Sequence, residues 1–154
     1  MGGATMKILV PVDGSELALD AVRYALRLHR EGLQAQFVLA TVQEPTYLYE
    51  MILPPSTEVL ERVAGAVGAR ALESAQELFQ ASGVPFESEI RGGDPATVLM
   101  EIAQSKDCEA IIMGMRGLGA LRSALMGSVS QAVLHAAKVP VTIVKHADVA
   151  PAPA

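Results

Sequence analysis

The sequence is poor in residues that would point to several common classes of protein. Its 154 residues include one cysteine, Cys108, so no intramolecular disulfide can form, and this usage is typical of a reducing compartment. Cys108 precedes a short apolar run, where we expect a structural thiol rather than a nucleophile. The 12 basic residues are outnumbered by 17 acidic ones and form no run, which argues against a sequence-independent grip on nucleic acid.

Long apolar stretches are missing as well. No run approaches the ~20 residues needed to cross a bilayer, and the N-terminus lacks the basic and apolar regions of a signal peptide. The opening MGGATM misses the myristoylation pattern, because Met6 stands where Ser or Thr is required. We therefore expect a cytoplasmic protein with no nucleic-acid and no membrane partner.

Apolar residues are nevertheless abundant, in short runs. They make up 51% of the chain against 19% charged residues, so the chain is expected to fold, and its length favours one domain. The β-branched and apolar runs predict five strands, at 6–12, 36–42, 86–90, 110–113 and 139–145. Between them lie four helical patterns, at 15–32, 58–81, 94–105 and 128–138.

The alternation of strands and helices predicts a doubly wound α/β domain. Strands that are apolar on both faces and separated by helices are typical of a five-stranded parallel sheet with helices on both faces. The run at 86–90 alternates apolar and polar residues, as a strand nearer the sheet edge does. We expect one domain over 6–146, with flexible ends at 1–5 and 147–154.

A ligand site is expected where the strand order reverses, beyond the carboxyl ends of the strands. Pro11, Val12 and Asp13 follow the first strand, and the glycine-rich stretch from Gly114 follows the fourth. Asp13 can either stabilise the turn into the first helix or accept hydrogen bonds from a ribose. The sequence leaves both interpretations open.

The glycine-rich stretch is typical of a site for an anion. Gly114 and Gly117 would let backbone N–H groups approach a phosphate, and Gly127 opens the next helix, whose N-terminus attracts negative charge. Ser128 fits a capping box with Gln131, so its hydroxyl can cap the helix, contact a phosphate or do both. Arg116 and Arg122 can neutralise phosphate charge or remain solvated. Neither the GxxxxGK[ST] nor the GxGxxG fingerprint is present.

The pattern Gly114-x2-Gly117-x9-Gly127-Ser128 resembles the ATP-binding signature of the universal stress protein family. KILVPVDGSE, GDPATVLMEIA, IIMGMRG, GSVSQAV and VPVTIVK resemble the family in the same order, from about Lys7 to Lys145. The resemblance implies a parallel sheet with strand order 3-2-1-4-5. It also places the chain in the branch that binds ATP, because the glycine signature is kept. One departure is Met115, where many relatives have a small serine.

The resemblance also implies a ligand and its contacts. The implied ligand is ATP, with Mg²⁺ held by its phosphates. Residues near the first, second and fourth strands would contact adenine and ribose, and residues around the second and third glycines would hold the phosphates and ribose. Together with the anion-site argument, the expected nucleotide-binding residues are Pro11, Val12, Asp13, Val42, Met113, Gly114, Arg116, Gly117, Gly127, Ser128, Val129 and Ser130.

Three functions remain open at this point. The family resemblance favours an ATP-binding regulatory protein that pairs as a homodimer through VPVTIVK, which begins at Val139 and ends at Lys145. A slow ATPase is the second, although no residue near the glycines is well suited to orient water, and we expect no efficient catalysis. The third is a nucleotide-independent dimeric interaction module that uses the loop from Tyr47 to Pro55. The sequence does not identify the signal, the protein partner or the active nucleotide state.

Overall fold

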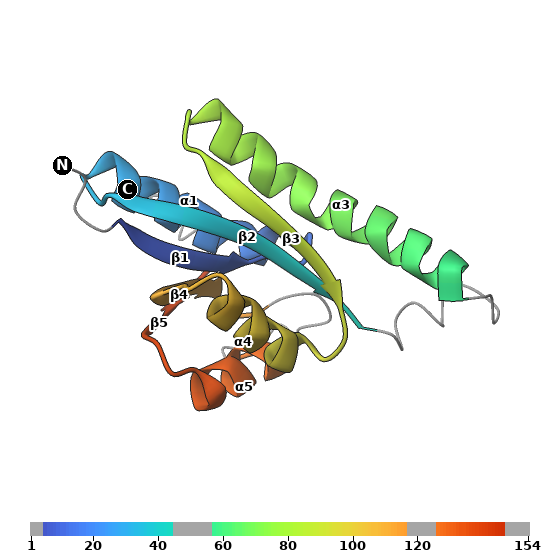
Figure 1. The fold of residues 1–154 in the computed structure, drawn as a ribbon. Coiled ribbons are helices and arrows are strands. Elements are labelled where there is room, and N and C mark those ends of the chain that lie inside the picture. Colours follow the sequence, from blue (N-terminus) through green and yellow to red (C-terminus); the bar gives the residue numbers. More distant parts are fainter. Residues whose placement is uncertain (1–4, 45–56, 117–125, 147–154) are drawn as a thin grey trace, which may run out of the picture.

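The computed structural model describes residues 5–44, 57–116 and 126–146. Nine helices and strands lie in this part of the chain (Figure 1). In chain order they are β1 (Met6–Pro11), α1 (Glu16–Arg30), β2 (Ala35–Gln43), α3 (Thr57–Ala81), β3 (Phe86–Gly92), α4 (Pro95–Ser105), β4 (Ala110–Gly114), α5 (Ser128–Ala136) and β5 (Val141–Val144). The expected ends at 1–5 and 147–154 lie almost wholly outside the described residues.

The five strands form one parallel sheet in the order β3-β2-β1-β4-β5, which confirms the predicted fold class and strand order. β1 lies at the centre, beside β2 on one side and β4 on the other. Successive connections run outward from β1 to β3, and the chain then returns to form β4 and β5 on the opposite side. The order therefore reverses between β1 and β4, which is the switch point at which ligands bind in such sheets.

Helices cover both faces of the sheet because the inner strands are apolar on both sides. α1 and α3 lie on one face, and α4 and α5 lie on the other (Figure 1). Along β2, Phe37 and Leu39 enter the cluster under α1 and α3, whereas Val38 and Ala40 enter the cluster with α4 and α5. Full burial of one apolar side chain of this kind stabilises the folded state by about 1.5–3 kcal/mol. Apolar contacts in the two clusters therefore hold both helical layers on the sheet.

Two elements near the C-terminus are shorter than expected. β5 spans four residues instead of the predicted seven, and α5 ends at Ala136 instead of 138. Pro140 has no N–H to give to a ladder, and only its carbonyl takes part, accepting a hydrogen bond from Ile111 N at 3.0 Å. The other predicted strands and helices agree with the structure to within two residues at either end.

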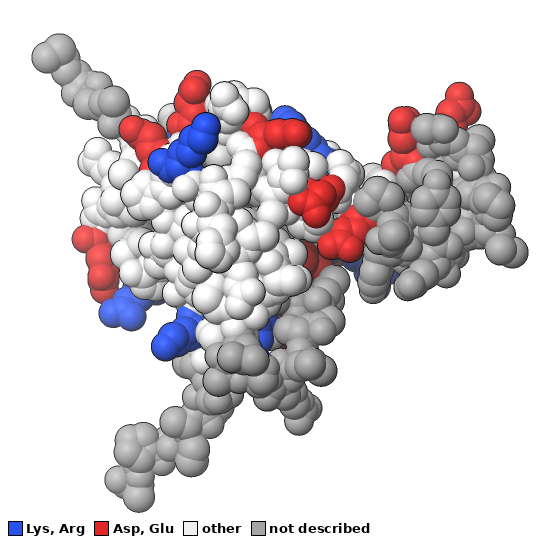
Figure 2. All heavy atoms as spheres, turned by 90° about the horizontal axis from the view of Figure 1, so that it is seen from below, with Lys and Arg blue, Asp and Glu red and all other residues white. Residues whose placement is uncertain are grey.

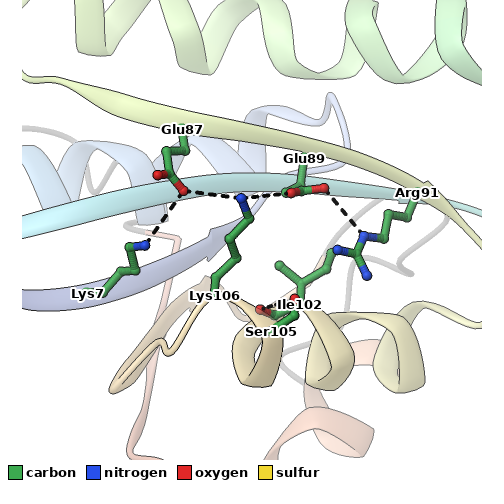
Figure 3. Close-up of polar contacts among 7 residues, drawn as sticks. All are labelled: Lys7, Glu87, Glu89, Arg91, Ile102, Ser105 and Lys106. Carbon is green, nitrogen blue, oxygen red and sulfur yellow. Dashed lines mark hydrogen bonds and ion pairs between the residues drawn. The ribbon is translucent and has the colours of Figure 1, made fainter.

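An ion-pair network joins α4 to the edge strand β3 (Figure 3). Lys106, at the C-terminal end of α4, lies 3.2 Å from Glu89 Oε1 and 3.5 Å from Glu87 Oε2. Glu87 also pairs with Lys7 of β1, and Glu89 with Arg91. The hydrogen bond with Glu89, followed by the charge of Glu87, raises the pKa of Lys106. Because these pairs are partly exposed, each contributes little to stability. The pairs of Lys106 with Glu87 and Glu89 link the C-terminal end of α4 to β3.

Charge is unevenly distributed on the face where α4 and α5 lie. Figure 2 shows this face from below, with charged side chains around its rim and few in its centre. Leu134 of α5 is one of the large apolar side chains left exposed. Among the described residues, no helix combines the length and the apolar character that crossing a membrane requires.

Candidate functional site

The carboxyl ends of the central strands lie together along one side of the sheet. Here "this edge" means the side formed by those strand ends and not an outermost strand. Leu9 of β1 pairs with Ile111 of β4, and the two strands are parallel, so both end on this side of the sheet. Beyond the strand ends, Val12 N donates to Ala40 O at 2.8 Å, and Met115 N donates to Val144 O at 3.0 Å. The backbone is therefore fixed on both sides of the switch point where the two chain turns emerge.

The turn after β1 is organised by Asp13. Its Oδ1 accepts hydrogen bonds from Ser15 N at 2.9 Å and from Ser15 Oγ at 2.6 Å. Ser15 Oγ in turn accepts from Ala18 N at 3.2 Å and caps α1, as its position predicts, while Gly14 takes the left-handed conformation with φ +87°. This geometry supports the turn-stabilising interpretation of Asp13, and a ribose contact stays a prediction.

Gly114, at the end of β4, lies against the first turn of α1. A Cβ placed on it would come within 2.9 Å of the carbonyl oxygen of Leu17 and 3.5 Å of Ala18 Cα. Glycine is thus required here by the close approach of another backbone. The same contact brings the end of β4 next to the turn that carries Asp13.

The start of α5 differs from the predicted capping box, and that prediction is wrong. Gly127 is the N-cap, with φ −70° and ψ 161°, and its carbonyl accepts from Gln131 N at 3.0 Å. Ser128 is consequently the first helical residue, with an exposed side chain, and among the described residues no side-chain hydrogen bond caps this helix. By contrast, α1 is capped by Ser15 and α4 by Asp94.

Ser130 and Met115 hold this helix start against the end of β4. Met115 O accepts hydrogen bonds from Gly127 N at 2.9 Å and from Ser130 Oγ at 2.7 Å. Met115 was not among the predicted site residues, because its contacts are made by its backbone and not by its side chain. No sequence signal distinguishes a carbonyl that receives two such bonds.

The remaining predicted residues occupy different depths. Val12 and Met113 are 5% exposed, and their side chains belong to the two buried clusters. Pro11 and Arg116 are half-buried, and Val42 and Val129 pack partly buried against the cluster under α4 and α5. Gly117, Arg122 and the loop from Tyr47 to Pro55 lie outside the described residues.

Two buried polar side chains that the sequence analysis did not select lie at the end of β2. Thr41 is 1% exposed and Gln43 is 9% exposed, and Gln43 Nε2 donates to Thr41 Oγ1 at 3.3 Å. By alternation with Phe37 and Leu39 they point to the face that α1 and α3 cover. Each therefore satisfies part of the other's hydrogen-bonding need beside the edge of the sheet.

The chemistry of this edge favours an anion. The first N–H groups of a helix have no intrahelical partner and carry partial positive charge, and no side chain caps those of α5 within the described part of the chain. In the same part, no group of three or more His, Cys, Asp or Glu side chains is arranged to hold a metal ion. The start of α5 thus presents helix-end donors next to the end of β4.

A curated relative is similar over most of the chain. Universal stress protein MJ0531 of Methanocaldococcus jannaschii is 30% identical over 139 residues, which cover 90% of this chain and 81% of the relative.

Solved structures share the fold. A universal stress protein solved in complex with cAMP is 25% identical, with a TM-score of 0.63, over 93% of this chain and 98% of that one. A universal stress protein family protein of Arabidopsis thaliana with AMP bound is 21% identical, with a TM-score of 0.63, over 91% of each chain. At 21% identity the second likeness supports the fold alone.

The family model described as the universal stress protein family matches residues 5–145, which contain every strand and helix of the sheet domain. The match therefore spans the doubly wound sheet from β1 to β5 and the glycines at 114 and 127. The chain belongs to the universal stress protein family.

Proposed function

We propose that this chain binds ATP at the carboxyl ends of β1 and β4, with Mg²⁺ held by the phosphates. We propose further that it acts as a nucleotide-dependent dimeric regulatory protein. The observation that carries the proposal is the N-terminus of α5, which no described side chain caps and which is fixed beside the end of β4. The helix-end N–H groups of Ser128 and Val129 are suited to phosphate oxygens. The relative in complex with cAMP supports an adenine nucleotide as the ligand.

The proposed contacts divide between the two sides of the edge. Pro11, Val12 and Asp13 adjoin the ribose and base from β1, and Val42 adjoins adenine from β2. Met113 and Gly114 contribute backbone at the end of β4, and Arg116 contributes positive charge. Gly127, Ser128 and Val129 bind phosphate, as does Gly117 by the family resemblance.

The regulatory part of the proposal rests on pairing and on differential affinity. β5 is an edge strand of the sheet, and an unpaired strand edge is suited to pairing with a second copy. A nucleotide that binds one conformation more tightly shifts the population toward it by that difference in affinity. We propose that the homodimer presents different surfaces to a protein partner in its bound and free states.

The first experiment is to measure the nucleotide content of protein purified without added ligand, by denaturing it and separating the supernatant by ion exchange. We expect ATP at close to one molecule per chain. Co-purified ADP would instead favour slow hydrolysis. If no nucleotide is found and calorimetry with Mg-ATP gives no heat, the proposal is wrong and a nucleotide-independent module takes its place.

A matched pair of variants locates the site. Gly127→Val places a branched side chain where a Cβ would lie 3.4 Å from Arg116 Cα, and it should abolish ATP binding while the fold is kept. Gly65→Val is the control, because a Cβ at position 65 meets nothing within 4 Å. Unchanged ATP affinity in Gly127→Val would move the site away from α5.

A further inference from the structure

The hydroxyl of Ser130 is buried and turned toward the backbone. Ser130 is 2% exposed, and its Oγ lies 2.7 Å from Met115 O and 3.0 Å from Gly127 O. A serine hydroxyl has one proton to donate, so the shorter contact receives the stronger bond and Gly127 O shares the proton. The proton is therefore directed to peptide carbonyls and not to the exterior.

These bonds tie two segments that are distant in sequence. Met115 O accepts from Ser130 Oγ and from Gly127 N, while Met115 N donates to Val144 O at 3.0 Å. The backbone of one residue at the end of β4 is thus joined through its N–H to β5 and, twice through its carbonyl, to the start of α5. We call this arrangement of Met115, Gly127 and Ser130 the carbonyl clasp.

The carbonyl clasp determines where the first N–H groups of α5 lie. Gly127 as N-cap and Ser130 one turn later are both bonded to the same oxygen, so the residues between them, Ser128 and Val129, cannot move independently of β4. Small displacements of donors reduce binding strongly, because hydrogen bonds to phosphate depend on distance and angle.

We propose that the Ser130 hydroxyl is a positioning group of the nucleotide site: through the carbonyl clasp it holds the phosphate-binding turn of α5 against β4, and its proton is given to protein carbonyls and not to the ligand. This inference rests on the proposed function. It gives the hydroxyl a role distinct from the direct phosphate or ribose contact that the family resemblance implies for Ser130. It follows that loss of the hydroxyl weakens binding of the phosphate-bearing part of the ligand and spares binding of the nucleoside part.

The test compares Ser130→Ala with Ser130→Thr, which keeps a hydroxyl, by calorimetry with Mg-ATP and with adenosine. For Ser130→Ala we expect ATP affinity about tenfold lower, the size of one net hydrogen bond, and unchanged adenosine affinity. Ser130→Thr should restore most of the ATP affinity. Thermal unfolding of each variant establishes that the fold is kept.

A second readout separates positioning from direct contact. Without ligand, the amide of Gly127 should exchange its hydrogen faster in Ser130→Ala than in the wild type, because the clasp loses one of its bonds. A residue that acted only by touching the ligand would leave exchange in the free protein unchanged, which would overturn the proposal.

The other outcomes are equally decisive. Wild-type ATP affinity in Ser130→Ala overturns the proposal, and so does an equal loss of ATP and adenosine affinity, since that would indicate a general structural role. If the wild type itself binds neither ligand, the proposed function fails, and the proposal for Ser130 fails with it. Measuring the wild type first keeps these two failures distinguishable.

Discussion

Gly114 and Leu17 approach each other so closely that a Cβ on residue 114 would lie 2.9 Å from the Leu17 carbonyl oxygen. The neighbour is backbone in the first turn of α1, so it cannot rotate away as a side chain could. This glycine therefore has a packing role, independent of any ligand, that joins the start of α1 to the end of β4.

We expect Gly114→Ala to lower the free energy of unfolding by about 1–3 kcal/mol, because the added methyl group forces α1 and β4 apart. Gly65→Ala is the matched control. Its Cβ meets nothing within 4 Å inside α3, and it should raise the free energy of unfolding by about 0.5–1 kcal/mol through helix propensity. Urea titrations measure both. Equal effects of the two substitutions would contradict the packing role.

Gly68 has a different neighbour, the side chain of Ile90 on β3. A Cβ on Gly68 would lie 2.3 Å from Ile90 Cγ2, so Gly68→Ala should destabilise the protein by about 1–2 kcal/mol. In an Ile90→Ala background the same change should instead stabilise α3, because only helix propensity remains. The double-mutant cycle in urea should give a coupling of about 1–3 kcal/mol. Additive effects would show that Ile90 moves aside without cost.

Much of the fold could be predicted because its signals are local. The apolar runs of β1, β2 and β4 and the alternation in β3 identify strands, and Asp94-Pro95 identifies the start of α4. Since strands buried on both faces need helices on both faces, the layer order followed from these signals. The alternation in β3 agrees with its place at the edge of the sheet, whereas the strand order was implied by the family resemblance.

The details of the site were less predictable because they depend on distant contacts. Ser15 and Ser128 look alike as helix caps, yet only Ser15 caps, since Gly127 is held by Met115 and shifts the start of α5 by one residue. The requirement for glycine at 114 comes from α1, nearly a hundred positions away in the chain. Neither contact leaves a trace in the local sequence.

Asp94 should make the stability of the protein depend on pH in the acid range. Hydrogen bonds from Thr97 Oγ1 at 2.8 Å and Thr97 N at 3.1 Å lower the pKa of this carboxyl below its ordinary 3.8. The contribution is therefore present above pH 3.8 and is lost as pH falls through the lower, folded-state pKa.

The variant Asp94→Asn keeps a side-chain oxygen at the helix start and removes the titration. We expect its urea midpoint to fall less than that of the wild type between about pH 6 and about pH 3. Thr97→Ala should likewise reduce the pH dependence, because it removes the bond that lowers the pKa most. Identical pH profiles for all three proteins would contradict the assignment.

Cys108 should react slowly with thiol reagents in the folded protein. It is 6% exposed in the cluster under α4 and α5, and burial raises the pKa of its thiol, so the reactive thiolate is both scarce and inaccessible. We expect labelling at about pH 8 to be at least about a hundredfold slower in buffer than in concentrated urea, since it requires local opening. Because the chain has no other cysteine, the signal comes from this residue alone. Fast labelling without denaturant would show that the β4 end of the sheet opens readily. The packing of α4 on the sheet would then be weaker than the buried cluster around Cys108 indicates.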